Sequence, residues 1–291
     1  MTFLDQVSRL YSNYASYVWK SVSHPFSNDN YFYLLIYLSL AVWILELLAP
    51  WRKEQRVFRK GFWIDAFYMF FNFFIFNLII FIALSSVSER YFGYFMQSIG
   101  LPKKGVFNLS ELSLWLQFPI FFFLADFIQW CIHVLLHRNK WLWKFHKVHH
   151  SVTEMGFAAH LRYHWMETLV YKTGLYIFMS WLLHFKLEHA FILHSFTILI
   201  GHLNHANIAI NYGPLKYLLN NPKMHIWHHA KHMPKSHPNG INFGITLSIW
   251  DYLFGTNHIP SDGRDIALGF EGIEKYPEDF ISLQSQPFKE K

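Results

Sequence analysis

Long apolar stretches, separated by short polar loops, dominate the pattern of residues along the chain. Three of them approach the length of about 20 residues that a helix needs to cross a bilayer: Tyr31–Ala49, Ala66–Ser86 and Leu112–Ile132. A fourth region, Leu169–Leu203, holds two shorter apolar pieces divided at His184–His189, and predicts a tight hairpin that dips into or just crosses the membrane. The pattern therefore predicts an all-α, polytopic membrane bundle of three long spans plus a short helical hairpin.

Four residues inside the predicted spans differ from their apolar neighbours. Asp126 interrupts the third span, and Asn72 and Asn77 interrupt the second. Polar side chains at membrane depth face the interior of a bundle, so we expect these three to point inward. Cys131, the only cysteine, is expected to be inert packing in the third span.

The first residues predict a separate helix. Apolar side chains recur at helical spacing through Met1–Lys20, which fits an amphipathic helix on the membrane surface or an ordinary packed helix. Asp5, Arg9 and the lack of a long apolar core argue against a signal peptide. Without linkers or repeats, we expect a single domain over 1–291, divided into an amphipathic segment (1–30), two spans with their loops (31–110), a catalytic region (111–256) and a tail (257–291).

The composition agrees with a membrane protein. The chain is 53% hydrophobic and 20% aromatic, and only 15% of its residues are charged, against about 25% in soluble domains. Its net charge of +6 is scattered in short loops beside apolar stretches, which fits anionic lipid headgroups and not nucleic acid.

Basic residues assign a side to the loops. The loop after the first span is the most basic, with Arg52, Lys53, Arg56, Arg59 and Lys60, so it is predicted to be cytoplasmic. Two further spans return the chain to that side at His137, where Arg138, Lys140, Lys144 and Lys147 agree with the assignment. The hairpin returns the chain again, so a histidine-rich helical cap is expected on the cytoplasmic side.

Three clusters of histidine carry the candidate chemistry: His133-x-x-x-His137, His146-x-x-His149-His150 and His225-x-x-His228-His229. Residues three and four apart share one face of a helix, and neutral imidazole is the commonest side-chain metal ligand. The first cluster ends the third span, and Trp141–His150 predicts a short helix. Asn221 as N-cap and Pro222 as first residue predict another over Lys223–Ala230. The clusters predict a polynuclear metal site.

The residues limit the metal without fixing it. A single cysteine excludes thiolate zinc sites and iron–sulfur clusters, and His-Glu-x-x-His of zinc peptidases is absent. Eight histidines exceed the ligands of one zinc ion and suit two metal ions. Iron, copper, zinc and nickel all remain possible by ligand type.

Several neighbouring residues are candidates to complete or support the site. His205 and His164 are predicted as further ligands, whereas His202 is expected to support the ligands by hydrogen bonds. Arg162, Glu167 and Asp251 are also expected to orient imidazoles and not to bind metal, because the Glu-x-x-His pattern of carboxylate di-iron bundles is absent.

A histidine-rich dinuclear site at the membrane surface suits the oxidation of an unactivated C–H bond in a lipid, which requires a redox metal because no side chain activates O2. No flavin or nicotinamide fingerprint is present, so electrons are expected from a separate protein, which the basic loops are suited to dock. The residues alone also allow a haem-binding membrane electron carrier, a zinc-dependent lipid hydrolase, or a non-catalytic metal or lipid carrier.

From about Phe122 to Thr256 the chain resembles the fatty acid hydroxylase and sterol desaturase superfamily of histidine-box membrane oxygenases, in its bacterial sterol-desaturase-like branch. The motifs are His133-x-x-x-His137-Arg, Lys144-Phe-His-Lys-Val-His-His-Ser151, Arg162-Tyr-His-Trp-Met-Glu167, Asn204-His-Ala-Asn207, Pro222-Lys-Met-His-Ile-Trp-His-His229, Asn242-Phe-Gly-Ile-Thr246 and Trp250-Asp-Tyr-Leu-Phe-Gly-Thr256. Trp-Met after His164 replaces the family's more usual Pro-Leu.

The resemblance implies two non-haem iron ions, O2 as co-substrate, a lipid substrate and electrons from a small cytochrome or ferredoxin with its reductase. Zinc is a possible substitute in purified protein. The family's ligands correspond to His205 and the eight histidines of the three clusters. Hydroxylation and desaturation both remain open.

Because each exposed CH2 costs about 0.8 kcal/mol, we expect the lipid to enter sideways through a groove between the third span and the hairpin, with Phe127, Trp130 and Phe196 as its walls.

Overall fold

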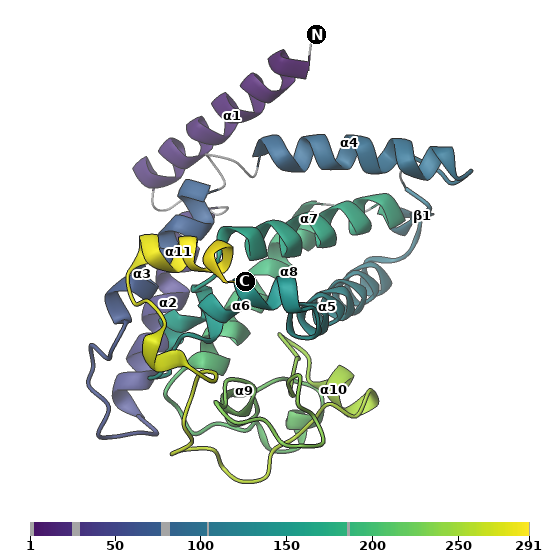
Figure 1. The fold of residues 1–291 in the computed structure, drawn as a ribbon. Coiled ribbons are helices and arrows are strands. Elements are labelled where there is room, and N and C mark those ends of the chain that lie inside the picture. The colour runs from purple at the N-terminus through teal and green to yellow at the C-terminus, as the bar shows by residue number, and fades with distance from the viewer. Residues whose placement is uncertain (1–2, 25–29, 77–81, 104, 185–186, 291) are drawn as a thin grey trace.

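The third predicted span and the predicted hairpin form three long helices: α5 (Leu114–Arg138), α7 (Trp165–Leu182) and α8 (Leu187–His205). α5 contacts both of the others. The computed structural model describes residues 3–24, 30–76, 82–103, 105–184 and 187–290. Within them the chain is mostly helical, as expected from the sequence (Figure 1).

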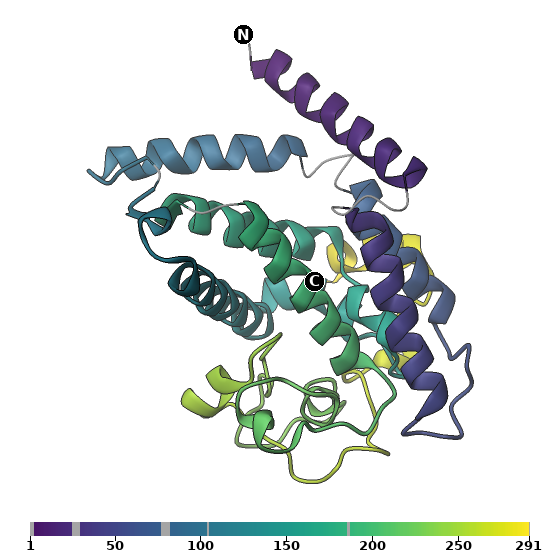
Figure 2. The ribbon, with the colours of Figure 1, turned by 180° about the vertical axis from the view of Figure 1, so that it is seen from behind.

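Two further pairs of helices surround this centre. α2 (Tyr31–Leu48) and α3 (Phe62–Phe70) lie against α8 and the short helix η4 (Phe157–Leu161). α1 (Phe3–Ser23) and α4 (Ile82–Ser98) contact each other, and α4 also contacts α7. Figures 1 and 2 show α1 and α4 on the side of the bundle opposite to α9 and α10.

Shorter elements connect the helices and cover one end of the bundle. They are the π-helical turn η1 (Phe71–Ile75), η3 (Leu109–Glu111), α6 (Lys140–His150), η5 (Gly213–Tyr217), α9 (Pro222–His228), α10 (Ile249–Leu253), η6 (Ile273–Lys275) and α11 (Phe280–Lys289). A parallel pairing of β1 (Phe107–Asn108) with β2 (Leu183–His184), which the hydrophobic pattern did not predict, ties the segment before α5 to the turn of the hairpin.

Asparagine side chains fix the helix starts that matter for the site. Asn139 ends α5 and caps α6, because its Oδ1 accepts hydrogen bonds from the backbone N–H groups of Trp141 and Leu142. Asn221 caps α9 through Met224 N, as predicted, and Pro222 is the first helical residue. α9 ends at His228, two residues earlier than the predicted helix.

Among the described helices, one is long and apolar enough to cross a membrane: α5, with 25 residues. α2 is apolar over the shorter stretch Phe32–Leu48. The expected second span, Ala66–Ser86, is not a single helix in the described residues. α3 ends at Phe70, η1 follows, and α4 begins at Ile82 and runs in a different direction (Figure 1).

The polar residues of the predicted spans have specific partners. Asn72 is buried in η1 and donates hydrogen bonds to the carbonyls of Leu161 and Tyr163, which explains a π-helical turn at this position. Asp126 is buried and accepts a hydrogen bond from Trp250 Nε1 at 2.8 Å. Both face inward as predicted, and Asn77 lies outside the described residues. Cys131 lies on α5, in the predicted span, and its side chain is exposed on the surface of the described chain.

A buried cluster of charge joins α3 to the loops around the centre. Asp65 is fully buried and accepts hydrogen bonds from Arg59 Nη2 (2.5 Å) and from Arg162 Nε. Arg162 also donates to Ser151 Oγ at 3.2 Å. Arg59 therefore belongs to the interior, although the sequence predicted it as part of an exposed basic loop.

Candidate metal centre

Nine histidines converge in two adjacent groups at the C-terminal end of α5. The first group contains His133, His137, His146, His150 and His228, and the second contains His149, His205, His225 and His229. Within each group, one nitrogen from every ring lies within 4.8 Å of those of the others. Eight of the nine side chains are buried and that of His137 is partly buried.

Each His-x-x-His-His motif supplies both groups. In α6, His146 and His150 are four residues apart on one face and join the first group, whereas His149 joins the second. The motif on α9 is divided the other way round: His225 and His229 join the second group, and His228 joins the first. Neighbouring helical positions differ by about 100° in direction. The expectation that each cluster points all its rings at one place was therefore wrong.

The inward-facing nitrogens have the spacing of ligands around one ion. His133 Nε2 lies 3.2 Å from His146 Nε2 in the first group. In the second, His205 Nε2 lies 3.3 Å from His149 Nε2 and 3.1 Å from His225 Nε2. With metal–nitrogen bonds of about 2.1 Å, adjacent ligands are separated by roughly 3.0–3.4 Å. The observed distances fall in this range.

The hydrogen bonds of the outward-facing nitrogens show that several inward-facing nitrogens carry a lone pair and no hydrogen. His133 Nδ1 lies 2.7 Å from the carbonyl oxygen of Phe243, His205 Nδ1 lies 2.8 Å from that of Gly201, and His228 Nδ1 lies 2.8 Å from that of Ile241. A carbonyl only accepts hydrogen bonds, so Nδ1 of each ring carries the hydrogen and Nε2 carries the lone pair.

Glu167 lies beside His146. Its Oε1 lies 3.0 Å from His146 Nδ1, although the contact is not aligned as a regular hydrogen bond. His146 Nε2 faces the Nε2 lone pair of His133 at 3.2 Å, and a cation between the two rings would bind both. The buried Nε2 atoms of His137, His150 and His228 have no hydrogen-bond partner in the described chain.

The rings are neutral and available as ligands. Burial lowers the pKa of His149, His225 and His228 well below the ordinary value of 6.5, and neighbouring imidazoles lower it further. A protonated ring cannot bind a metal, so burial keeps these histidines in the state that a metal requires.

A buried loop holds two of these rings from behind. Asp251 accepts hydrogen bonds from the backbone N–H groups of Phe243 (2.9 Å) and Gly244 (2.7 Å). Asn242, in the left-handed conformation with φ 52°, donates to the carbonyls of Met224 and His258. Asp251 thus acts on His133 through the carbonyl of Phe243 and not by direct contact. The sequence pattern did not indicate the role of these loop carbonyls.

His164 does not belong to either group, although it was predicted as a ligand. It caps α7, where its Nδ1 accepts a hydrogen bond from Met166 N at 3.1 Å. Its Nε2 lies 2.9 Å from the carbonyl oxygen of Gln284 near the C-terminus. Both ring nitrogens are occupied by the fold, so we remove His164 from the proposed ligand set.

The remaining predicted supporting residues act at a greater distance. His202 lies between Ser39 Oγ (3.1 Å) and His160 Nδ1 (3.2 Å). Arg162 belongs to the cluster around Asp65 and has no hydrogen bond to a histidine of the centre in the described residues. A side chain at Gly201 would lie 2.2 Å from the His160 ring, so this glycine allows η4 to approach α8.

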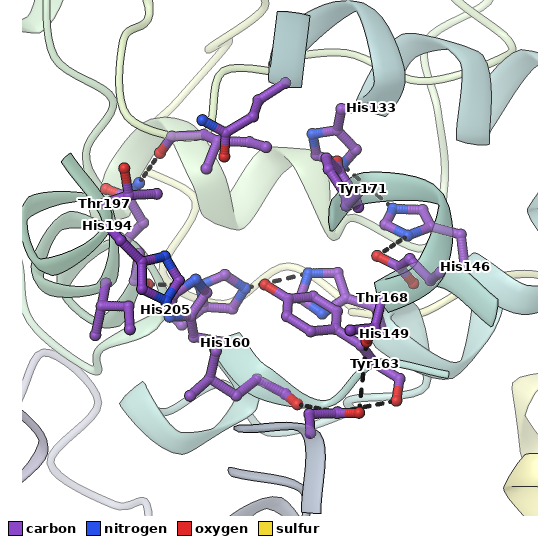
Figure 3. Close-up of a pocket in the computed structure, with 18 of the residues that line it drawn as sticks. His133, His146, His149, His160, Tyr163, Thr168, Tyr171, His194, Thr197 and His205 are labelled. Carbon is purple, nitrogen blue, oxygen red and sulfur yellow. Dashed lines mark hydrogen bonds and ion pairs between the residues drawn. The ribbon is translucent and has the colours of Figure 1, made fainter. Parts of the chain in front are cut away.

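A cavity of about 140 Å³ opens beside the two groups (Figure 3). Histidines of both groups line it, and so do side chains of α5, α7 and α8, including Gln129, Tyr171 and Thr197. The helices are those predicted for a substrate groove, but the predicted wall residues were wrong. Phe127 and Trp130 stack on each other and on Phe254, and Phe196 contacts Phe122, so none of the three lines the cavity.

The fold and the nitrogens define the class: a helical protein with a polyhistidine centre that fits two metal ions. Residues 118–256, just under half of the chain, match the model of the fatty acid hydroxylase family. This match confirms, over this region, the resemblance to the family that was seen in the sequence.

Curated relatives agree with this family. The chain is 33% identical over 168 residues to ornithine lipid hydroxylase of Rhizobium tropici, which covers 58% of this chain and 49% of that protein. It is 30% identical over 157 residues to alkylglycerol monooxygenase of Homo sapiens, covering 52% of this chain and 32% of that protein. The aligned part thus spans half or less of these relatives. No solved structure matches the chain.

Proposed function

We propose that the protein is a membrane-bound lipid hydroxylase that holds two iron ions, one in each group of histidines. The observation that carries this proposal is that the nine histidines form two adjacent sets of candidate ligands and that histidines of both sets line one cavity. The similarity to relatives named as a lipid hydroxylase and as monooxygenases favours hydroxylation over desaturation.

The residues of this chain would hold and orient the metals. His133, His205 and His228 present Nε2 because carbonyls accept their Nδ1–H groups, and Glu167 lies 3.0 Å from His146 Nδ1. When bound, iron supplies the O2-dependent oxidation of an unactivated C–H bond, with electrons from outside the chain. Burial of the histidines excludes water, which protects the reaction from hydrolytic side reactions.

The proposed location is an integral membrane protein with its active site on the cytoplasmic side. α5 is apolar and long enough to span, and the centre lies at its C-terminal end. A lipid that stays in the bilayer would then reach the cavity from between α5, α7 and α8. The number of other membrane crossings is part of the proposal.

The proposed electron donor is a separate acidic protein. Lys53 and Arg56 are exposed on the loop after α2, and the chain carries no dinucleotide fingerprint. Opposite charges steer such encounters and raise the association rate. A small cytochrome or a ferredoxin with its reductase fits this role.

Mass spectrometry of lipid extracts tests the proposal. Cells that produce the protein should gain lipids with one additional oxygen atom, and cells that produce His228→Ala or His225→Ala should not. His232→Ala is the matched control, because His232 is exposed and outside both groups. Lipids cleaved without a gain of oxygen from O2 would instead indicate a zinc-dependent hydrolase and overturn the proposal.

A further inference from the structure

The cavity beside the histidines adjoins a smaller apolar cavity of about 20 Å³. The two share Gln129, Leu175, His194 and Thr197, and the second adds Phe121, Ala125, Met179 and Leu193. We use "the channel" for the two together. It runs between α5, α7 and α8, from the two groups of histidines toward the N-terminal half of α5.

Each helix faces the channel with positions about four residues apart, which share one face. α5 contributes Phe121, Ala125, Gln129 and His133, and α8 contributes Leu193, Thr197, Gly201 and His205. The stripe on α7 starts in the preceding loop, with Tyr163, Glu167, Tyr171, Leu175 and Met179. On all three helices the order is the same: metal-side groups, then hydrogen-bonding side chains, then apolar side chains.

Two phenol groups stand out at the metal end. The ring of Tyr163 lies 5.2 Å from that of His149, and the ring of Tyr171 lies 6.4 Å from that of His133 (Figure 3). One tyrosine thus lies beside each group of histidines. In the described residues neither hydroxyl has a hydrogen-bond partner, although both side chains line the channel. Both hydroxyls are therefore available to donate hydrogen bonds to a molecule in the channel, so an occupant that accepts hydrogen bonds is favoured here.

We infer that the substrate is a lipid with a hydrogen-bonding oxygen or nitrogen near the oxidised carbon, held by Tyr163, Tyr171 and Gln129, and with one hydrocarbon chain in the apolar part of the channel. This inference rests on the proposed function and adds the substrate class. A hydroxyl, ether, ester or amide linkage meets the requirement. Gln129 is one helical turn from His133, about 6 Å along the axis, so oxidation falls within roughly five bonds of that linkage.

Binding of matched probes tests the polar part. Zinc-loaded protein in detergent binds a nitroxide-labelled fatty acid that quenches tryptophan fluorescence, and 1-hexadecanol or hexadecane competes for the channel. Wild-type protein should prefer the alcohol by roughly 2- to 12-fold for each hydrogen bond gained. The double variant Tyr163→Phe/Tyr171→Phe should lose that preference and bind hexadecane unchanged. Tyr252→Phe, outside the channel, is the control and should keep the preference.

A second variant tests the apolar part. Ala125→Leu fills the narrow cavity, so it should weaken the binding of both probes equally and leave their ratio unchanged. In protein loaded with iron and supplied with electrons, tandem mass spectrometry should locate the new oxygen near the polar linkage. A preference that survives loss of both phenols, or oxidation at the remote chain end, overturns the inference.

The two proposals fail in different ways. If the probe preference depends on the phenols but no lipid is oxidised, the proposed function is wrong and the channel specificity stands. If lipids gain oxygen at the remote chain end while the phenols have no effect on binding, the proposed function stands and the inferred substrate class is wrong.

Discussion

At the scale of single residues, the nitrogen that faces away from each group of histidines decides what the other nitrogen does. The carbonyl oxygens of Phe243, Gly201 and Ile241 accept hydrogen bonds from the Nδ1–H groups of His133, His205 and His228. The lone pairs are then directed inward before any metal binds, which reduces the reorganisation that binding requires. Metal ions bound to these lone pairs add interactions that the unfolded chain lacks, so metal binding should stabilise the fold.

Single substitutions should remove the metals one at a time. His228→Ala should lower the metal content from two ions per chain to about one by disabling the first group, and His225→Ala should do the same through the second. His164→Ala should keep both metals and lose about 1 kcal/mol of stability as a helix cap. Inductively coupled plasma mass spectrometry measures the content. An unchanged metal content in both ligand variants would contradict the assignment.

Metal-free protein should become less stable below about pH 6.5, the ordinary pKa of histidine. Burial lowers the pKa of His149, His225 and His228 in the folded protein, so at lower pH the unfolded chain binds more protons than the folded one. The free energy of unfolding therefore falls as the pH falls. Thermal unfolding at several pH values tests this, and a melting temperature independent of pH between about 7.5 and 5.5 contradicts it.

At the scale of elements, the buried carboxylate of Asp65 connects α3 to the loop that ends in Tyr163. Arg162, next to Tyr163 in sequence, binds Asp65, and Asn72 binds the carbonyl of Tyr163. Two separate interactions thus position the segment that carries one of the two channel phenols. Removing the carboxylate would leave two buried guanidinium groups without their partner.

Asp65→Ala should therefore destabilise the protein by about 3–5 kcal/mol, because the remaining charges stay buried. Glu54→Ala is the matched control: it removes the exposed pair with Arg264 and should cost about 0–1 kcal/mol. Chemical denaturation in detergent compares the two. Equal effects would show that the Asp65 cluster does not connect these elements.

Several elements of the site were predictable from local sequence. Asn221-Pro222 marks the start of α9, and the apolar stretches give α2, α5 and the hairpin within a few residues at most ends. The division of each His-x-x-His-His motif between two groups was not predictable, because it depends on how α6 and α9 are placed around α5. His164 was misassigned for the same reason: only the folded chain brings Gln284 to its ring.

At the scale of the whole molecule, the C-terminal segment packs against α6, the helix that carries three of the nine histidines. α11 contacts α6, and Lys147 Nζ lies 2.7 Å from Glu290 Oε2. Residues 257–291 were predicted to be a tail, because their composition does not indicate these contacts. The hydrophobic pattern also predicted one continuous second span. The described residues of that region instead form the separate elements α3, η1 and α4.

Cysteine labelling tests the membrane topology. With Cys131 changed to serine, cysteines introduced at Lys53, Lys147 and Lys231 should all react from the cytoplasmic side, because these positions surround the end of the bundle that carries the centre. An impermeant maleimide applied to vesicles of either orientation measures this. Labelling of Lys147 and Lys231 from opposite sides would contradict a hairpin that returns the chain to the same face.

The central claim is that two metal ions held by nine histidines oxidise a lipid with O2. The most direct measurement supplies oxygen-18 gas to purified, iron-loaded protein with a chemical reductant and lipid extract, and follows the label by mass spectrometry. We expect a product lipid that carries one labelled oxygen atom. This product should not form with zinc-loaded protein or with the His228→Ala variant. Protein that holds two iron ions and consumes reductant and O2, yet leaves every lipid unlabelled, would contradict it.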